Sequence, residues 1–275
     1  MDTPLPLYSP GIDPGPSFME LLRRTAPHQL PGGALGEHTG SGGAPGVDIV
    51  HGTTVVAIRY ADGVLMAGDR RATAGMMIAS RRIEKVFPAD DHSGVAIAGA
   101  AGPAVEMVRL FQTQLEHYEK VQGSALSLEG KANQLGQMVR ANLQAAMVGF
   151  VVVPLFAGYD HHRDRGRVFS YDVTGGRYEE LDFQAQGSGS IHARNWIKAA
   201  WTEGMSADAV IELALRALFA AADEDAATGG PDLVRRIFPT IALIDADAYR
   251  QFTDDEVEQR AQALLGGPER GGDAT

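Results

Sequence analysis

The hydrophobic pattern of the chain changes abruptly near Thr53, where a strand-like run begins. Residues 53–60 are rich in β-branched side chains, and the turn-forming residues 61–63 separate them from the apolar run 64–68. This pattern is typical of a β-hairpin. Further strands are predicted at 75–80, 83–87 and 94–98. Because only short polar turns separate these runs, the early sheet is predicted to be antiparallel.

Apolar residues recur at helical spacing in the middle of the chain. Two helices that pair as a layer are predicted at 103–121 and 126–147. Strands are predicted to return at 150–158, 167–171 and 178–183. Two more helices and a last strand are predicted at 192–202, 207–222 and 237–244. Strands and helices thus occur in blocks rather than in strict alternation, which favours an α+β layered sandwich over a doubly wound parallel sheet.

Two helix starts carry suitable capping residues. Ser206 can serve as the N-cap of the helix at 207–222. The sequence Thr253-Asp-Asp-Glu256 has the form of a capping box and predicts a short amphipathic helix. After this helix, residues 266–275 are predicted to be a disordered tail.

The segment before Thr53 has a different composition. It holds eight of the 14 prolines and ten of the 33 glycines, and such a segment cannot form a stable core. Only residues 18–22 suggest a short helical patch. We therefore predict a flexible leader over residues 1–52 and one folded domain over residues 53–265.

Charge and cysteine content exclude several classes of function. The formal net charge of -11 gives no basic surface for phosphate groups, so nucleic acid is not an expected partner. The absence of cysteine excludes disulfide scaffolds, thiolate zinc sites and cysteine nucleophiles. No secretory signal is recognisable, and the longest apolar stretch, 148–159, is too short to span a bilayer. A soluble, cytoplasmic protein without a membrane partner is expected.

Two further groups of residues favour structural interpretations. His161-His162, with Asp160 and Asp164 nearby, lacks the helical His-Glu-x-x-His spacing of a zinc site, so a solvated turn is favoured. No metal and no cofactor are expected. The pair Met76-Met77 is predicted to lie in the core.

Thr53 is the first candidate for catalysis. A threonine hydroxyl is a weak nucleophile unless a base takes its proton, and an α-amine with a reference pKa of about 7.7–8.0 is such a base. If the leader were cut before Thr53, one residue would supply both groups. Threonines at the start of a strand are more often ordinary strand formers, so the assignment depends on other residues.

Lys85 and Asp69 are the next candidates. In the predicted strand 83–87, the period of two places Lys85 on the same face as Ile83 and Phe87, toward the core. A buried lysine is expected to pair with an acid, and Asp69 at the end of the hairpin is well placed for this. The alternatives are that Lys85 extends to solvent along the sheet edge and that Asp69 caps a turn.

Two glycine-rich segments complete the set of candidates, Gly187-Ser188-Gly189-Ser190 and Asp225-Ala-Ala-Thr228-Gly229-Gly230. Each can bring backbone N–H groups and hydroxyls close to a reacting centre. Taken alone, each is a common loop, and the first lacks the lysine of a P-loop.

Together these residues resemble the proteasome β subunits, most closely the actinobacterial type. The motifs are Gly52-Thr53-Thr54, Gly68-Asp69-Arg70-Arg71, Arg82-Ile83-Glu84-Lys85-Val86, the two glycine-rich segments, and 227–235 followed by Ile237-Phe-Pro239. The resemblance covers residues 53 to about 265. It implies a four-layer αββα sandwich of the N-terminal nucleophile hydrolase superfamily. It also implies a catalytic subunit of the 20S core, a threonine endopeptidase that degrades unfolded proteins to peptides.

The resemblance further implies a role for each candidate. The catalytic set that it implies is Thr53, Asp69, Lys85, Ser188, Asp225 and Thr228. Thr53 would be the nucleophile, and Asp69 would orient Lys85. The family usually has serine where this chain has Thr228, which keeps the hydroxyl. Autocatalytic cleavage between Gly52 and Thr53 would remove residues 1–52 as a propeptide, so the precursor would be inactive.

Substrate binding is also implied by the resemblance. Peptide backbone would bind at Thr73, Gly99 and Ala101, with the Gly99 N–H as oxyanion donor. The specificity pocket would be lined by Ala72, Ile83, Ile97, Ala101 and Ala104. Its apolar character suggests cleavage after hydrophobic residues.

The implied partners are a homo-heptameric β ring, rings of α subunits, a ring-shaped ATPase and substrates carrying a ubiquitin-like tag. Three alternatives stay open: a simpler ATP-dependent bacterial peptidase of the same superfamily, a small-molecule amidohydrolase active as a free protomer, and a catalytically silent ring subunit. The long leader, Asp225 and the Thr228-Gly-Gly loop argue against the first. The presence of Thr53, Asp69 and Lys85 argues against the last.

Overall fold

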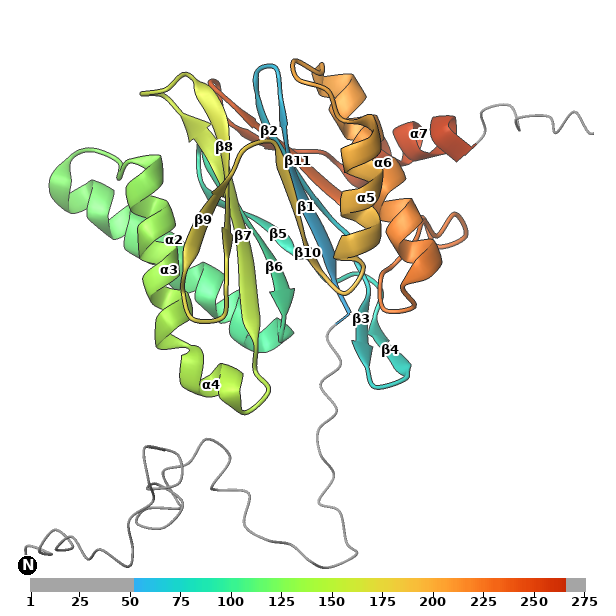
Figure 1. Cartoon of the computed structure of the whole chain (residues 1–275), viewed down its shortest axis with the longest axis horizontal. Coiled ribbons are helices and arrows are strands. Elements are labelled where there is room, and N and C mark those ends of the chain that lie inside the picture. The colour runs from blue at the N-terminus through green and yellow to red at the C-terminus, as the bar shows by residue number, and fades with distance from the viewer. Residues whose placement is uncertain (1–51, 266–275) are drawn as a thin grey trace, which may run out of the picture. The chain divides into compact units, whose positions relative to one another are not determined.

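The computed structural model describes residues 52–265, and its elements carry the labels of Figure 1. Two five-stranded antiparallel sheets form the centre of this part of the chain. In spatial order, the first contains β10 (Phe183–Gly187), β1 (Thr54–Tyr60), β2 (Gly63–Gly68), β11 (Thr240–Asp245) and β12 (Tyr249–Gln251). The second contains β5 (Val86–Asp90), β6 (Ser93–Gly99), β7 (Val152–Asp160), β8 (Arg165–Tyr171) and β9 (Arg177–Glu180). A separate hairpin pairs β3 (Ala72–Ala74) with β4 (Met77–Ser80).

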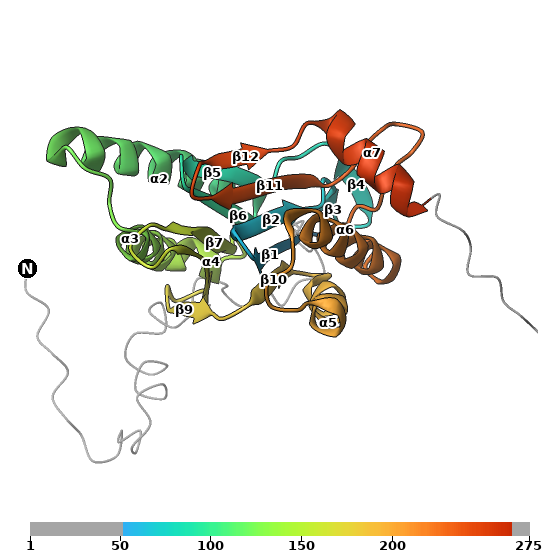
Figure 2. The same ribbon diagram turned by 90° about the horizontal axis from the view of Figure 1, so that it is seen from above.

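Helices flank the strands on both sides (Figures 1 and 2). On the side of the second sheet lie α2 (Ala101–Gln122), α3 (Leu128–Ala141) and the short α4 (Leu143–Met147). On the side of the first sheet lie α5 (Ser190–Ala200), α6 (Ala207–Glu224) and α7 (Asp254–Leu265). Between residues 52 and 265, no helix is both long and apolar enough to cross a membrane.

The side chains of β1 alternate between two faces, and each face packs into a different hydrophobic cluster. Val55 and Ala57 lie in one buried cluster with residues of the second sheet such as Leu155. Val56 and Ile58 belong to a different cluster, formed with side chains of α5, α6 and α7. A third cluster joins the second sheet to α2 and α3. Because successive side chains of a strand point to opposite faces, β1 buries one face against the other sheet and one against helices.

Several sequence predictions are confirmed. Strands β1 and β2 form the predicted antiparallel hairpin. The Ser206 hydroxyl accepts the N–H of Ala209 at the start of α6. At the start of α7, the Glu256 carboxylate accepts the N–H of Thr253 at 2.8 Å, and the Thr253 hydroxyl accepts the N–H of Glu256 at 3.3 Å. This reciprocal pair is the predicted capping box.

The predicted strand at 178–183 is wrong. Strand β9 ends at Glu180 in the second sheet, and β10 begins at Phe183 in the first sheet, where it pairs with β1. Leu181 between them is exposed and lies in a bend. The chain therefore changes sheets within a run that has no glycine or proline to mark the change.

Two other predictions need correction. The helix predicted at 126–147 is interrupted at Asn142, which separates α3 from α4. Met76 and Met77 were predicted in the core but are exposed, because they lie at the tip of the β3–β4 hairpin. The predicted helical patch at 18–22 lies outside the described residues.

Candidate active site

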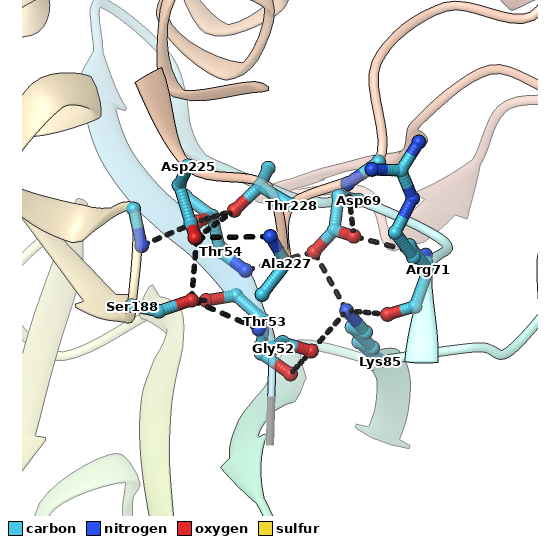
Figure 3. Close-up of polar contacts among 12 residues, drawn as sticks. Gly52, Thr53, Thr54, Asp69, Arg71, Lys85, Ser188, Asp225, Ala227 and Thr228 are labelled. Carbon is cyan, nitrogen blue, oxygen red and sulfur yellow. Dashed lines mark hydrogen bonds and ion pairs between the residues drawn. The ribbon is translucent and has the colours of Figure 1, made fainter. Parts of the chain in front are cut away.

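Thr53 lies immediately before β1, which is an inner strand of the first sheet. Strand β1 runs between β10 and β2, so each neighbour brings a different loop to its N-terminal end. The loop after β10 supplies Ser188, and the loop after β2 supplies Asp69. Thr53 is 4% exposed. The sheet order thus gathers residues distant in sequence around one threonine (Figure 3).

Lys85 and Asp69 form a buried ion pair beside Thr53. Their side chains are 5% and 0% exposed, and Lys85 Nζ lies 2.7 Å from Asp69 Oδ1. Lys85 Nζ also donates to the carbonyls of Arg71 at 2.6 Å and Gly52 at 3.2 Å. These three acceptors match the three donors of an ammonium group. Lys85 does not extend to solvent, contrary to the alternative interpretation.

Burial lowers the pKa of Lys85, and the charge of Asp69 opposes this effect without cancelling it. The carboxylate of Asp69 is itself fixed by three backbone donors. It accepts the N–H groups of Thr54 at 2.8 Å, Arg71 at 2.9 Å and Gly229 at 2.8 Å. A buried carboxylate with this many donors holds Lys85 in one position.

The strand predicted at 83–87 begins only at Val86, so alternation does not direct Lys85 inward. Lys85 and Val86 are both buried, so burial does not alternate between these two positions. The extended segment before β5 is held instead by backbone bonds. Ile97 N–H donates to the Lys85 carbonyl at 2.9 Å, and Ile83 N–H donates to the Arg70 carbonyl at 3.2 Å.

Ser188, Asp225 and Thr228 form a second polar group on the other side of Thr53. Ser188 Oγ and Thr228 Oγ1 lie 2.5 Å and 2.6 Å from Asp225 Oδ2. The Thr53 N–H donates to Ser188 Oγ at 3.4 Å. Burial opposes the charge of Asp225, but the hydrogen bonds from Ser188 and Thr228 outweigh it and lower the pKa of this carboxyl.

Thr54 joins these two groups, although its place in the Gly52-Thr53-Thr54 motif predicts no role for its side chain. Its N–H binds Asp69, and its hydroxyl lies 2.6 Å from Thr228 Oγ1. It also accepts the Gly189 N–H at 3.1 Å. A β-branched residue in a strand carries no sequence signal for the partner of its hydroxyl.

Gly52 and Thr53 are arranged closely at the predicted cleavage site. Thr53 Oγ1 donates to the Gly52 carbonyl oxygen at 2.7 Å, and Lys85 Nζ approaches the same oxygen. A Cβ atom on Gly52 would lie 2.2 Å from the Cβ of Ala227. Only glycine fits here without a shift of the 225–230 loop.

The predicted substrate-binding residues are distributed over four segments. They are Ala72 and Thr73 in β3, Ile83 before β5, Ile97 and Gly99 in β6, and Ala101 and Ala104 in α2. Ile97 and Ala104 are each 4% exposed, whereas Ala101 is exposed. Gly99 has a φ of +124°, and a Cβ there would lie 2.1 Å from the Val151 carbonyl oxygen, so this position requires glycine. That these residues line one common substrate pocket stays a prediction.

The described residues contain no group of three or more side chains able to hold a metal ion. Residues 161–164 form the turn between β7 and β8, where Asp160 Oδ1 accepts the His162 N–H at 3.0 Å. This agrees with the predicted solvated turn.

Comparison with known proteins gives a consistent result. A family model described as "Proteasome subunit" matches residues 49–234. The chain is 56% identical over 260 residues to "Proteasome subunit beta" of Acidimicrobium ferrooxidans, which covers 94% of this chain and 93% of that protein. It is 52% identical over 263 residues to the protein of the same name from Streptomyces griseus, covering 95% and 91%. The protein of that name from Acidothermus cellulolyticus is 52% identical over 273 residues, covering 96% and 92%.

Proposed function

Since the chain belongs to the proteasome subunit family, as a β subunit with threonine endopeptidase activity, we propose that Thr53 is the residue that carries this activity. One observation supports the proposal above all. The buried hydroxyl of Thr53 lies 2.7 Å from the carbonyl oxygen of Gly52, and Lys85 Nζ lies 3.2 Å from the same oxygen. A nucleophile and a cation thus converge on one peptide bond.

The first reaction is removal of the leader. Thr53 Oγ1 attacks the Gly52 carbonyl carbon, the Gly52–Thr53 C–N bond breaks, and the nitrogen takes up the hydroxyl proton. The chain is then joined through an ester. Water hydrolyses this ester, releasing residues 1–52 with a carboxylate on Gly52 and a free amine on Thr53.

The second reaction is peptide hydrolysis by the freed residue. The Thr53 amine accepts the proton of its own hydroxyl, and Oγ1 attacks the substrate carbonyl. The Gly99 N–H stabilises the oxyanion, and the positive charge of Lys85 lowers the pKa of the Thr53 amine and hydroxyl. The leaving amine takes the proton, and water resolves the acyl-enzyme. The apolar side chains proposed for the pocket favour cleavage after hydrophobic residues.

The domain organisation follows from this chemistry. Residues 1–52 are the propeptide, residues 53–265 the catalytic domain and residues 266–275 the C-terminal tail. The catalytic domain has the four-layer αββα arrangement of the N-terminal nucleophile hydrolases. The three hydrophobic clusters support it, because one lies between the sheets and the other two join a sheet to helices.

The subunit assembles into a proteasome core with α subunits, as its family implies. We propose a homo-heptameric β ring in the cytoplasm, supplied by a ring-shaped ATPase with substrates that carry a ubiquitin-like tag.

Intact mass after coexpression with the α subunit tests the proposal. The wild-type chain should lose residues 1–52, and Thr53→Ala should keep them and show no peptidase activity. Thr53→Ser keeps a hydroxyl and is the matched control, which should still be processed. A Thr53→Ala chain with the wild-type mass distribution would refute autolysis by Thr53. A wild-type chain that resists a threonine-directed covalent inhibitor in the assembled particle would indicate a silent subunit.

A further inference from the structure

Thr54 connects the two polar groups that surround Thr53. It is fully buried. Its backbone exchanges two hydrogen bonds with Asp69: the Thr54 N–H donates to Oδ1 at 2.8 Å, and the Thr54 carbonyl accepts the Asp69 N–H at 3.0 Å. Its hydroxyl lies 2.6 Å from Thr228 Oγ1 and accepts the Gly189 N–H at 3.1 Å. Figure 3 shows Thr54 between Asp69 and Asp225.

The chemistry of the neighbouring groups fixes the direction of each hydrogen bond. The pKa of Asp225 is lowered, so at neutral pH its carboxylate only accepts. Thr228 must therefore give its single hydroxyl hydrogen to Asp225 Oδ2, at 2.6 Å. Its oxygen is left as the acceptor toward Thr54, so Thr54 donates to Thr228. The Gly189 N–H in turn occupies an acceptor position of Thr54.

The same rule applies to Ser188. It lies 2.5 Å from Asp225 Oδ2 and 3.3 Å from the Thr53 carbonyl oxygen, and it has one hydrogen to give. The shorter bond to the charged carboxylate is the stronger one. Ser188 Oγ therefore faces Thr53 as an acceptor of its N–H. In the processed chain this leaves the lone pair of the amine free to act as the base.

We propose that Thr54 is a positioning residue for the catalysis by Thr53, an inference that rests on the proposed function. Its hydroxyl donates to Thr228, and this bond holds Thr228 and Ser188 as parallel donors to Asp225. The Gly189 N–H, held by the same hydroxyl, fixes the turn that carries Ser188. Without the Thr54 hydroxyl, Thr228 loses its donor, Gly189 loses its acceptor, and Ser188 is no longer confined to face the Thr53 amine.

Thr54→Val tests this role because it keeps the shape of the side chain and removes the hydroxyl. The full chain is coexpressed with the α subunit, and intact mass, thermal stability, kcat and KM are measured with a fluorogenic peptide. We expect Thr54→Val to lower kcat about tenfold, with KM within about twofold of the wild type. Thr54→Ser, which keeps the hydroxyl, should have a kcat close to that of the wild type. Thr240→Val, at a buried threonine of β11, is the control for loss of a buried hydroxyl.

A double-mutant cycle separates this role from simple packing. Thr228→Val breaks the same chain of hydrogen bonds, so Thr54→Val and Thr228→Val combined should lower kcat no more than the more severe single variant. Additive losses, or a wild-type kcat in Thr54→Val, would overturn the inference. If Thr54→Val does not fold, a wild-type kcat in Thr228→Val overturns it equally. The inference is supported if the Thr54→Val chain folds but keeps its leader while the Thr54→Ser chain is processed.

Thr53→Ala is measured in the same series to separate the two proposals. If Thr53→Ala keeps peptidase activity, the proposed function itself fails. If Thr53→Ala is inactive while Thr54→Val has the wild-type kcat, only the role of Thr54 is refuted.

Discussion

Replacement of Lys85 by alanine leaves Asp69 as a buried carboxylate without its cation. The two side chains are 5% and 0% exposed, and their charged atoms lie 2.7 Å apart. Breaking a buried pair from one side costs about 3–5 kcal/mol, because the remaining charge is uncompensated. Asp69 keeps the backbone donors of Thr54, Arg71 and Gly229, so we expect the lower end, about 3 kcal/mol. For a domain of this size, that corresponds to a melting temperature lower by about 6–12 °C.

The same substitution should also stop both reactions of Thr53. Lys85 Nζ is the cation near the Gly52 carbonyl oxygen, so its loss removes charge stabilisation where the leader is cut. We expect Lys85→Ala to retain residues 1–52 by intact mass and to hydrolyse no peptide. Thermal unfolding of the unassembled precursor, at fixed protein concentration, measures the stability cost separately.

Lys131 provides a matched control in the same chain. It is also buried, and its Nζ lies 2.5 Å from Asp90 Oδ2. Lys131→Ala should lower the melting temperature but leave processing intact. Equal loss of processing in both variants would show that instability, rather than the position of Lys85, is responsible.

A double variant separates charge balance from catalysis. Lys85→Met with Asp69→Asn removes both charges and should recover much of the stability lost in Lys85→Ala. It should remain unprocessed and inactive. Peptide turnover in Lys85→Ala or in the double variant would refute the catalytic role of Lys85 and leave it a structural one.

Two further predictions concern the cleavage site and its acidic support. Gly52→Val should slow removal of the leader severely, because the added side chain would collide with Ala227. A Cβ at position 52 would lie 2.2 Å from the Ala227 Cβ. A processing rate equal to that of the wild type, measured by mass spectrometry, would contradict this. Asp225→Asn tests the lowered pKa of this carboxyl. Wild type should be the more stable above the ordinary value of 3.8, and its advantage should disappear as pH falls through the lower folded-state pKa. An unchanged difference in melting temperature between pH 7 and pH 2 would contradict it.

Local sequence signals predicted the elements whose boundaries are set by local chemistry. The hairpin of β1 and β2 follows from β-branched runs around a turn, and the capping box of Thr253 and Glu256 follows from residues three positions apart. The change of sheets at Leu181 has no such signal, because a strand's partner depends on distant chain segments. Met76 and Met77 are exposed despite their hydrophobic side chains, because hydrophobicity alone does not show whether the tip of a hairpin contacts other elements.

The candidate site divides in the same way. The residues themselves, Thr53, Asp69 and Lys85 among them, could be selected from motifs and from resemblance to a family. The ion pair was expected from the need of a buried lysine for an acid, but the strand used to orient Lys85 does not include it. Backbone bonds to β6 and to the 69–71 segment direct Lys85 instead.

By itself, the sequence determined which residue types are available for catalysis and where a glycine-rich leader meets a β-strand. Only the tertiary structure decided that Thr54 links Asp69 to Thr228, and that the Gly52 carbonyl lies within reach of both Thr53 and Lys85. Thr54 lies 15 positions from Asp69 and 174 from Thr228, and Lys85 lies 33 positions from Gly52, so these contacts depend on the order of strands in a sheet. That order is set by the packing of the whole domain and leaves no mark on the local spacing of residues.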